Sequence, residues 1–353
     1  MEMSGHLLYI DITQICGIGC SFCMYAERHQ VGAQLALSEH ARQNLARLIN
    51  DPAVKRVSIS GEGEPLNNVN AFHAILGLSR GGVAFEFITS GFLPHDRLKS
   101  FYDETEAIVR ERGDACNIRL SSDSYHIEKI RHRPHGMSLQ RALATPEGPL
   151  SFSFRSVDTD RTFTRNYLLA EAAGCPGLAH IIDVSPLEDR LVVGDKVFAI
   201  DYKNHVHPSD DVSHTRLDMH GYIQAIEARI GKRFTLGSLN PMPLRNGIDL
   251  TIKPDGTVAL YGIENIALGN MHTDNFSWDE LTRRVANDPL VRRLHTIPFL
   301  DMLARISDQD AVCALARKAN NPYWLVKELG MVCRTRQQSR LTRKLTETRP
   351  SGS

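Results

Sequence analysis

The 353-residue sequence predicts an α/β fold in which parallel strands alternate with helices, followed by a smaller α+β C-terminal extension. Short strand-like segments recur through the first part of the chain, and segments with helical periodicity separate them. Further on, two alternating segments flank Pro254-Asp255-Gly256, which has the composition of a hairpin turn. Strands that alternate with helices are typically parallel and joined by right-handed crossovers.

The elements of the first part follow from local patterns. Strands are expected at residues 7–13, 56–60, 85–89, 118–122, 151–156 and 180–185. Ser38 is a suitable N-cap for a helix whose apolar positions share one face, namely Ala41, Leu45, Leu48 and Ile49. A second helix is expected over residues 67–79, and further helical segments separate the later strands.

Three regions are expected along the chain: a barrel-like unit over residues 1–190, an extension over 191–333 and a tail over 334–353. The extension should contain the hairpin of residues 248–261 and helices. Cations at helical spacing make the tail basic, and they include Arg336, Arg340, Arg343 and Lys344. A solvated, disordered tail is favoured over a docking site for an acidic partner.

Three cysteines stand between the first strand and the first helix, in the run Cys16-Gly17-Ile18-Gly19-Cys20-Ser21-Phe22-Cys23. Three thiolates this close can hold three corners of a cubane iron–sulfur cluster and leave the fourth iron open to a substrate. A Cys3His zinc site with His29, or simply buried thiols, are the alternatives. A disulfide framework fits less well, because the seven cysteines are an odd number and no secretory signal begins the chain. We therefore expect reduced thiols and a cytoplasmic location.

A second motif follows the second expected strand, which runs into Gly61-Glu62-Gly63-Glu64-Pro65. Glycines let backbone groups approach a ligand closely, and Pro65 stiffens the exit from the turn. The spacing C-x3-C-x2-C and this turn together resemble the cysteine motif and the "GGEP" motif of the radical S-adenosylmethionine (radical SAM) superfamily. Glu62 stands where many members have a second glycine.

This resemblance implies a fold and a set of cofactor residues. The fold would be a partial (β/α)6 TIM-like barrel with its chemistry at the carboxyl ends of the strands. One [4Fe–4S] cluster would be held by Cys16, Cys20 and Cys23, and SAM would bind the open iron. The SAM amino group would lie at the turn formed by Gly61, Glu62, Gly63, Glu64 and Pro65.

Strand ends supply the other candidate SAM contacts. Thr89 lies in a Thr-Ser-Gly turn that resembles the family's "TNG" turn, and Ser122 and Asp123 resemble its "S-x-D" strand end. Arg155, on the fifth strand, has the guanidinium chemistry to hold the SAM carboxylate, although an ordinary ion pair explains it equally well. No catalytic residue is assigned. Three nearby histidines, His126, His132 and His135, are explained as well by a solvated helix face.

The hairpin and the later Leu268-Gly269-Asn270 resemble the SPASM/twitch extensions, in which cysteines ligate auxiliary clusters. No cysteine occurs between Cys175 and Cys313. The scaffold is therefore expected without an auxiliary cluster.

The activity that the resemblance implies is reductive cleavage of SAM to a 5′-deoxyadenosyl radical. That radical would abstract hydrogen from a peptide or a small, sugar-like or aminocyclitol-like molecule in a natural-product or maturation pathway. An external donor of the flavodoxin or ferredoxin type would supply the electron. Because the first strand begins at Leu7, a leader-binding protein would have to be a stand-alone partner.

Charge and hydropathy weigh against other partners. Lys+Arg and Asp+Glu are equal at 41 each, which disfavours nucleic acid, and no apolar run has the length of a membrane span. An RNA-modifying radical SAM enzyme, favoured only by the basic tail, and a zinc-containing binding module remain as alternatives.

Overall fold

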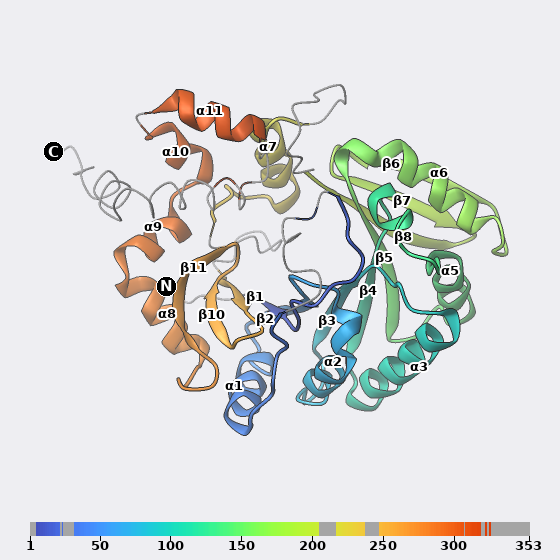
Figure 1. The fold of residues 1–353 in the computed structure, drawn as a ribbon, viewed down its shortest axis with the longest axis horizontal. Coiled ribbons are helices and arrows are strands. Elements are labelled where there is room, and N and C mark those ends of the chain that lie inside the picture. Colours follow the sequence, from blue (N-terminus) through green and yellow to red (C-terminus); the bar gives the residue numbers. More distant parts are fainter. Residues whose placement is uncertain are drawn as a thin grey trace.

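One sheet runs through the part of the chain that the computed structural model describes, which comprises residues 5–21, 23, 32–204, 217–236, 247–306, 308–318, 322 and 325. Its eleven strands lie in the order β11-β10-β9-β1-β2-β3-β4-β5-β8-β7-β6 (Figure 1). The sheet is not closed, since β11 and β6 form its two edges. The predicted α/β class with a partial, TIM-like barrel is confirmed.

Six neighbouring strands are parallel: β1 (His6–Asp11), β2 (Val54–Ser60), β3 (Ala84–Thr89), β4 (Ala115–Ser121), β5 (Leu150–Val157) and β8 (Lys196–Lys203). The helices that connect them lie along the outside of the sheet (Figure 1): α1 (Glu39–Ile49), α2 (Val69–Leu76), α3 (His95–Arg112), α5 (His135–Ala144) and α6 (Arg161–Ala172). Ser38 caps α1 as expected, because its side chain accepts a hydrogen bond from the Ala41 amide. Short turns of helix precede three of them: η2 (Pro65–Asn68), α4 (Ser124–Ile127) and η3 (Asp158–Asp160).

The expectation that residues 180–185 form the sixth parallel strand is wrong. That segment is β6 (Ala179–Ser185), an edge strand that pairs antiparallel with β7 (Glu188–Val193), and β8 takes the place beside β5. Burial explains the difference: alternate residues of β8, Phe198 and Ile200, are at most 2% exposed, whereas Ile182 on β6 is 44% exposed. A tight turn at Gly194, whose φ is 57°, folds β7 back onto β8.

The expected hairpin around Pro254-Asp255-Gly256 is confirmed, and it extends the same sheet. β9 (Asp249–Ile252) pairs antiparallel with β10 (Thr257–Leu260), which pairs with β11 (Ile263–Asn270). On its other side β9 pairs parallel with β1, so β1 lies between the two parts of the sheet. The later helices are α7 (Met219–Ile230), α8 (Trp278–Asn287), α9 (Pro289–Thr296), α10 (Phe299–Ala304) and α11 (Gln309–Lys318). The basic tail lies outside the described residues, and no described helix combines the length and apolar character needed to cross a bilayer.

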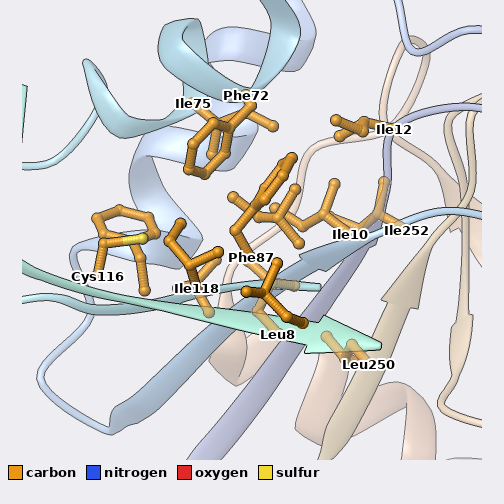
Figure 2. Close-up of a cluster of buried hydrophobic side chains, with 14 of the residues drawn as sticks. Leu8, Ile10, Ile12, Phe72, Ile75, Phe87, Cys116, Ile118, Leu250 and Ile252 are labelled. Atoms are coloured by element: carbon orange, nitrogen blue, oxygen red, sulfur yellow. The ribbon is translucent and has the colours of Figure 1, made fainter. Parts of the chain in front are cut away.

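The two faces of the parallel strands differ in polarity because side chains alternate along a strand. Toward the helices the face is apolar and buried (Figure 2), with Leu8, Ile10, Phe87 and Ile118 packed beneath Phe72 of α2.

The opposite face, inside the curve of the sheet, is charged. Arg119 on β4 forms ion pairs with Glu86 on β3 at 2.5 Å and with Asp201 on β8 at 3.4 Å. Burial acts to raise the pKa of Glu86, but the charges of Arg119 and Arg56 lower it overall. Helix α7 approaches this face, where Arg229 pairs with Asp201 at 3.1 Å.

The extension is docked on α1 through the side chain of Asn44, which is fully buried. Its amide nitrogen donates to the carbonyl oxygens of Met271 and Asp274 at 2.9 and 2.8 Å, and its oxygen accepts from the Phe276 amide at 3.0 Å. One side chain thus satisfies three backbone groups of the loop between β11 and α8.

We expect Asn44→Ala to lower the free energy of unfolding by about 2–3 kcal/mol, because it leaves the Met271 carbonyl oxygen without its donor and the Phe276 amide without its acceptor. Urea denaturation measures the difference. Gln43→Ala is the control, since Gln43 lies on the exposed side of the same helix. Equal stabilities of the two variants would contradict this role of Asn44.

Candidate active site

The loops that follow the parallel strands lie together at the carboxyl ends of those strands. The loop that carries Cys16, Cys20 and Cys23, called the cysteine loop, leaves from the end of β1. Its base is closed by backbone pairing. Thr13 forms an antiparallel bridge with Gln34, and the Gln14 amide donates to the Ala33 carbonyl oxygen at 2.8 Å. The loop therefore starts and ends at one fixed position. His29, the candidate zinc ligand, lies outside the described residues.

The structure brings the three cysteines to one place. Cys20 is buried, Cys16 and Cys23 are half-buried, and the Cys23 amide donates to the Cys20 carbonyl oxygen at 3.1 Å. Burial, together with the negative charges of Asp123 and of the other two cysteines, raises the pKa of Cys20 to about 12. An iron centre would have to displace the Cys20 proton on binding, because the thiolate is the form that ligates a metal.

No three His, Cys, Asp or Glu side chains among the described residues converge as ligands of a single metal ion. A cubane cluster makes no such demand, because each cysteine ligates a different iron. The donor set at this position therefore fits an iron–sulfur cluster.

The turn formed by residues 61–65 packs directly on the backbone that leads into the cysteine loop. The Gly63 amide donates to the Thr13 carbonyl oxygen at 3.0 Å, and the Glu64 amide donates to that of Ile15 at 2.9 Å. A Cβ atom on Gly63 would lie 2.3 Å from the Ile15 oxygen, and one on Gly61 would lie 2.6 Å from the Thr13 oxygen. Both glycines are thus required by the approach of two chain segments. Contact of this turn with SAM stays a prediction.

The two glutamates of the turn point to different partners. Glu64 is 4% exposed and accepts hydrogen bonds from the Thr89 hydroxyl and from the Ser90 amide and hydroxyl, the last two at 2.9 and 2.7 Å. It also caps η2, which begins at Pro65. The candidate residues Glu64, Pro65 and Thr89 are therefore brought together, and Glu64 connects the loops that follow β2 and β3.

Glu62 turns the other way. Its carboxylate accepts a hydrogen bond from Gln14 Nε2 at 2.7 Å and forms an ion pair with Lys253 Nζ at 3.1 Å. The ion pair of Glu62 with Lys253 was not predicted from the sequence, because the two residues are 191 positions apart.

At the end of β4, Asp123 caps α4 and binds His126 through Nδ1 at 2.8 Å. Burial acts to raise the pKa of Asp123, but the charge and hydrogen bonds of His126, helped by Lys203, lower it overall. Asp123 is thus held as a carboxylate near the cysteines.

Ser122 is fully buried beside His135, and this pair belongs to the packing of α5 and α6. His135 Nε2 lies 3.0 Å from Ser122 Oγ and 3.1 Å from the Ser121 carbonyl oxygen, which can only accept. Nε2 therefore carries the proton, and Nδ1 accepts from the Tyr167 hydroxyl at 2.8 Å. The explanation of His135 by a solvated helix face is wrong.

Lys203 is a site residue that the sequence interpretation missed. It ends β8, and its neighbours include Asp123, Cys23 and Cys20, whose negative charges act to raise its pKa. Burial, with the charge of Arg155, lowers the pKa overall. The alternating run Phe198-Ala199-Ile200-Asp201-Tyr202 was the signal for a strand that would carry Lys203 to the carboxyl edge.

Arg155 lies on the polar face of β5, paired in register with Asp201 and with Ser121. Burial acts to lower the pKa of Arg155, but Asp201 and the hydroxyls of Tyr261 and Tyr222 raise it overall. The guanidinium thus lies among aromatic hydroxyls inside the curve of the sheet. Its contact with the SAM carboxylate stays a prediction.

No protein-family model and no curated protein matches this chain. Solved structures do match it. The structure of anSMEcpe with bound AdoMet and Cp18Cys peptide has 13% sequence identity and a TM-score of 0.51, covering 98% of this chain and 100% of that chain. The structure of anSMEcpe with bound AdoMet alone has 14% sequence identity and a TM-score of 0.52, covering 97% of this chain and 100% of that chain. BtrN in complex with AdoMet and 2-DOIA matches with 12% identity and a TM-score of 0.45, covering 84% of this chain and 89% of that chain.

We expect Gly63→Val to reduce both the stability of the fold and the iron bound per chain, because any Cβ there collides with the backbone next to Cys16. Iron content after anaerobic reconstitution measures the second effect. Gly174→Val is the matched control, since the nearest atom to a Cβ there is 3.7 Å away. Full iron loading of the Gly63 variant would argue against the close approach.

The buried His135 makes stability depend on pH. Burial lowers its pKa in the folded state to about 3, whereas an unfolded histidine titrates near pH 6.5. The unfolded chain therefore binds the proton first, so stability is complete above about pH 6.5 and falls as the pH drops toward 3, by up to about 1.4 kcal/mol per pH unit. Urea unfolding between pH 7 and 5 should show a steeper slope in the native chain than in His135→Asn. Equal pH dependence of the unfolding free energy in the two proteins would contradict this role of His135.

Proposed function

We propose that this chain, which has the fold of the radical SAM enzyme anSMEcpe, is itself a radical SAM enzyme. One observation carries the proposal: Cys16, Cys20 and Cys23 lie together in the loop that leaves the carboxyl end of β1, at the same end of the parallel strands as the glycine turn of residues 61–65. The residues fit one [4Fe–4S] cluster with three cysteine ligands.

When bound, such a cluster supplies the electron that cleaves SAM to methionine and a 5′-deoxyadenosyl radical, after an external donor of the flavodoxin or ferredoxin type has reduced it. The chain's own residues fix the position and charge of the site. Cys16, Cys20 and Cys23 would hold three irons, and the positive charge of Lys203 offsets those of the thiolates and of Asp123.

The SAM site would lie between the turn of residues 61–65 and the ends of β3, β4 and β5. Since the Glu64 carboxylate already accepts four hydrogen bonds, we assign the amino group of SAM to backbone carbonyl groups of the turn. Asp123 is an acceptor suited to the ribose hydroxyls, and Arg155 is suited to a carboxylate.

The substrate is proposed to be a peptide or a small polar molecule of the sugar or aminocyclitol kind. Support comes from the charged inner face of the sheet, where Glu86, Arg119 and Asp201 are paired beneath the site. A radical attacks whatever lies nearest, so such a site must hold the substrate in one orientation and exclude water. A stand-alone leader-binding protein would assist if the substrate is a peptide.

The proposal predicts that anaerobic reconstitution yields a brown protein with about four irons per chain. Dithionite and SAM should then give 5′-deoxyadenosine, and simultaneous change of Cys16, Cys20 and Cys23 to Ala should abolish both iron binding and cleavage. Iron analysis and chromatography of the nucleoside measure the two effects. A colourless protein that binds zinc would favour the binding-module alternative, and about eight irons per chain would show a second cluster.

A further inference from the structure

We infer that Lys253, in the turn of the C-terminal hairpin, is a positioning residue for the cysteine loop and acts through its ion pair with Glu62. The inference rests on the proposed function in that the loop is taken to hold the cluster. The contacts that connect Lys253 to the loop do not depend on the proposed function.

Sheet topology brings the groups together. β9, β1 and β2 are adjacent and parallel, and Ile10 pairs in register with both Ile252 and Ile59. Their carboxyl ends therefore lie side by side, so that residues following the three strands meet although they are far apart in the sequence. Lys253 follows β9, Gln14 follows β1 and Glu62 follows β2.

A continuous set of contacts then runs from Lys253 to the cysteine loop. Lys253 Nζ lies 3.1 Å from Glu62 Oε1, and Gln14 Nε2 donates to Glu62 Oε2 at 2.7 Å. Gln14 Oε1 in turn accepts from the Ala33 amide at 3.0 Å. The side-chain amide of Gln14 therefore closes the base of the loop and also binds the Glu62 carboxylate. Gln14 lies two residues before Cys16.

The lysine is held by a rigid turn. The Lys253 amide donates to the Thr257 carbonyl oxygen at 2.9 Å, and the Gly256 amide donates to that of Lys253 at 2.8 Å. Gly256 has a φ of 83°, and a Cβ there would lie 2.4 Å from the His272 ring. The backbone of Lys253 is therefore fixed beside the turn of residues 61–65, and its side chain reaches Glu62.

Burial makes the pairing matter. The Glu62 side chain is 1% exposed and that of Lys253 is 17% exposed. A buried carboxylate is costly unless it is paired, so removing the lysine takes an opposite charge away from a side chain that is almost fully buried. A movement of the Glu62 side chain toward water would reduce this cost. Such a movement would release Gln14 and loosen the base of the loop.

The test compares Lys253→Met, Glu62→Gln and the double variant. Lys253→Met should speed hydrogen–deuterium exchange at the base of the loop, in residues 12–15 and 32–35 of the metal-free chain, and weaken SAM binding to the reconstituted protein by roughly tenfold. Glu62→Gln keeps an acceptor for Gln14 and removes the charge, so it should change hydrogen–deuterium exchange only slightly. Adding it to Lys253→Met should restore slow exchange.

Lys99→Met is the matched control, because it also breaks an ion pair, with Asp103, but on the exposed outer face of α3. The inference is overturned if Lys253→Met exchanges like Lys99→Met, or if the double variant is as impaired as Lys253→Met. The latter result would mean that the lysine stem only fills space. Exchange is measured without iron or SAM, so these outcomes decide the role of Lys253 even if the native chain proves unable to bind a cluster.

Discussion

The close approach of two backbone segments, residues 13–15 and the glycine turn at Gly61 and Gly63, is the constraint on which the site depends. With no side chain between them, the amides of Gly63 and Glu64 bind the carbonyl oxygens of Thr13 and Ile15 directly. The cysteine loop is thereby fixed to the end of β2 at one side. At the other side, the bridge between Thr13 and Gln34 closes its base. The three thiols are consequently carried by a loop whose two ends cannot separate.

Three buried carboxylates lie in the loops at this end of the sheet. Glu64 binds the end of β3 and Glu62 binds the C-terminal hairpin, whereas Asp123 binds His126 within its own segment, on α4. Such pairing is required because an isolated carboxylate in a dry interior is unstable. Its consequence is that the loops at the carboxyl edge hold one another in position. Lys203, at the end of β8, lies near Asp123, Cys20 and Cys23.

The position of β1 in the sheet gives the extension its influence on the site. β1 is hydrogen-bonded to β2 on one side and to β9 on the other, so the extension adds one strand, β9, to the parallel series. The carboxyl end of β9 therefore lies beside the cysteine loop. The sheet is open, with β6 and β11 as its edge strands. Helix α7 borders the charged inner face, where its Arg229 forms an ion pair with Asp201.

Local and periodic features were determined by the sequence alone: the cysteine spacing, the glycine turn, the Ser38 cap, five of the parallel strands and the hairpin at residues 254–256. These depend on neighbours a few positions apart, so the pattern carries them. Only the tertiary structure decided the sixth strand and the partners of Glu62, Glu64 and Ser122, because competing strands are chosen by total burial and side-chain partners come from distant segments. Lys203 and Lys253 were missed for that reason: their importance comes from strand order, which residue spacing does not contain.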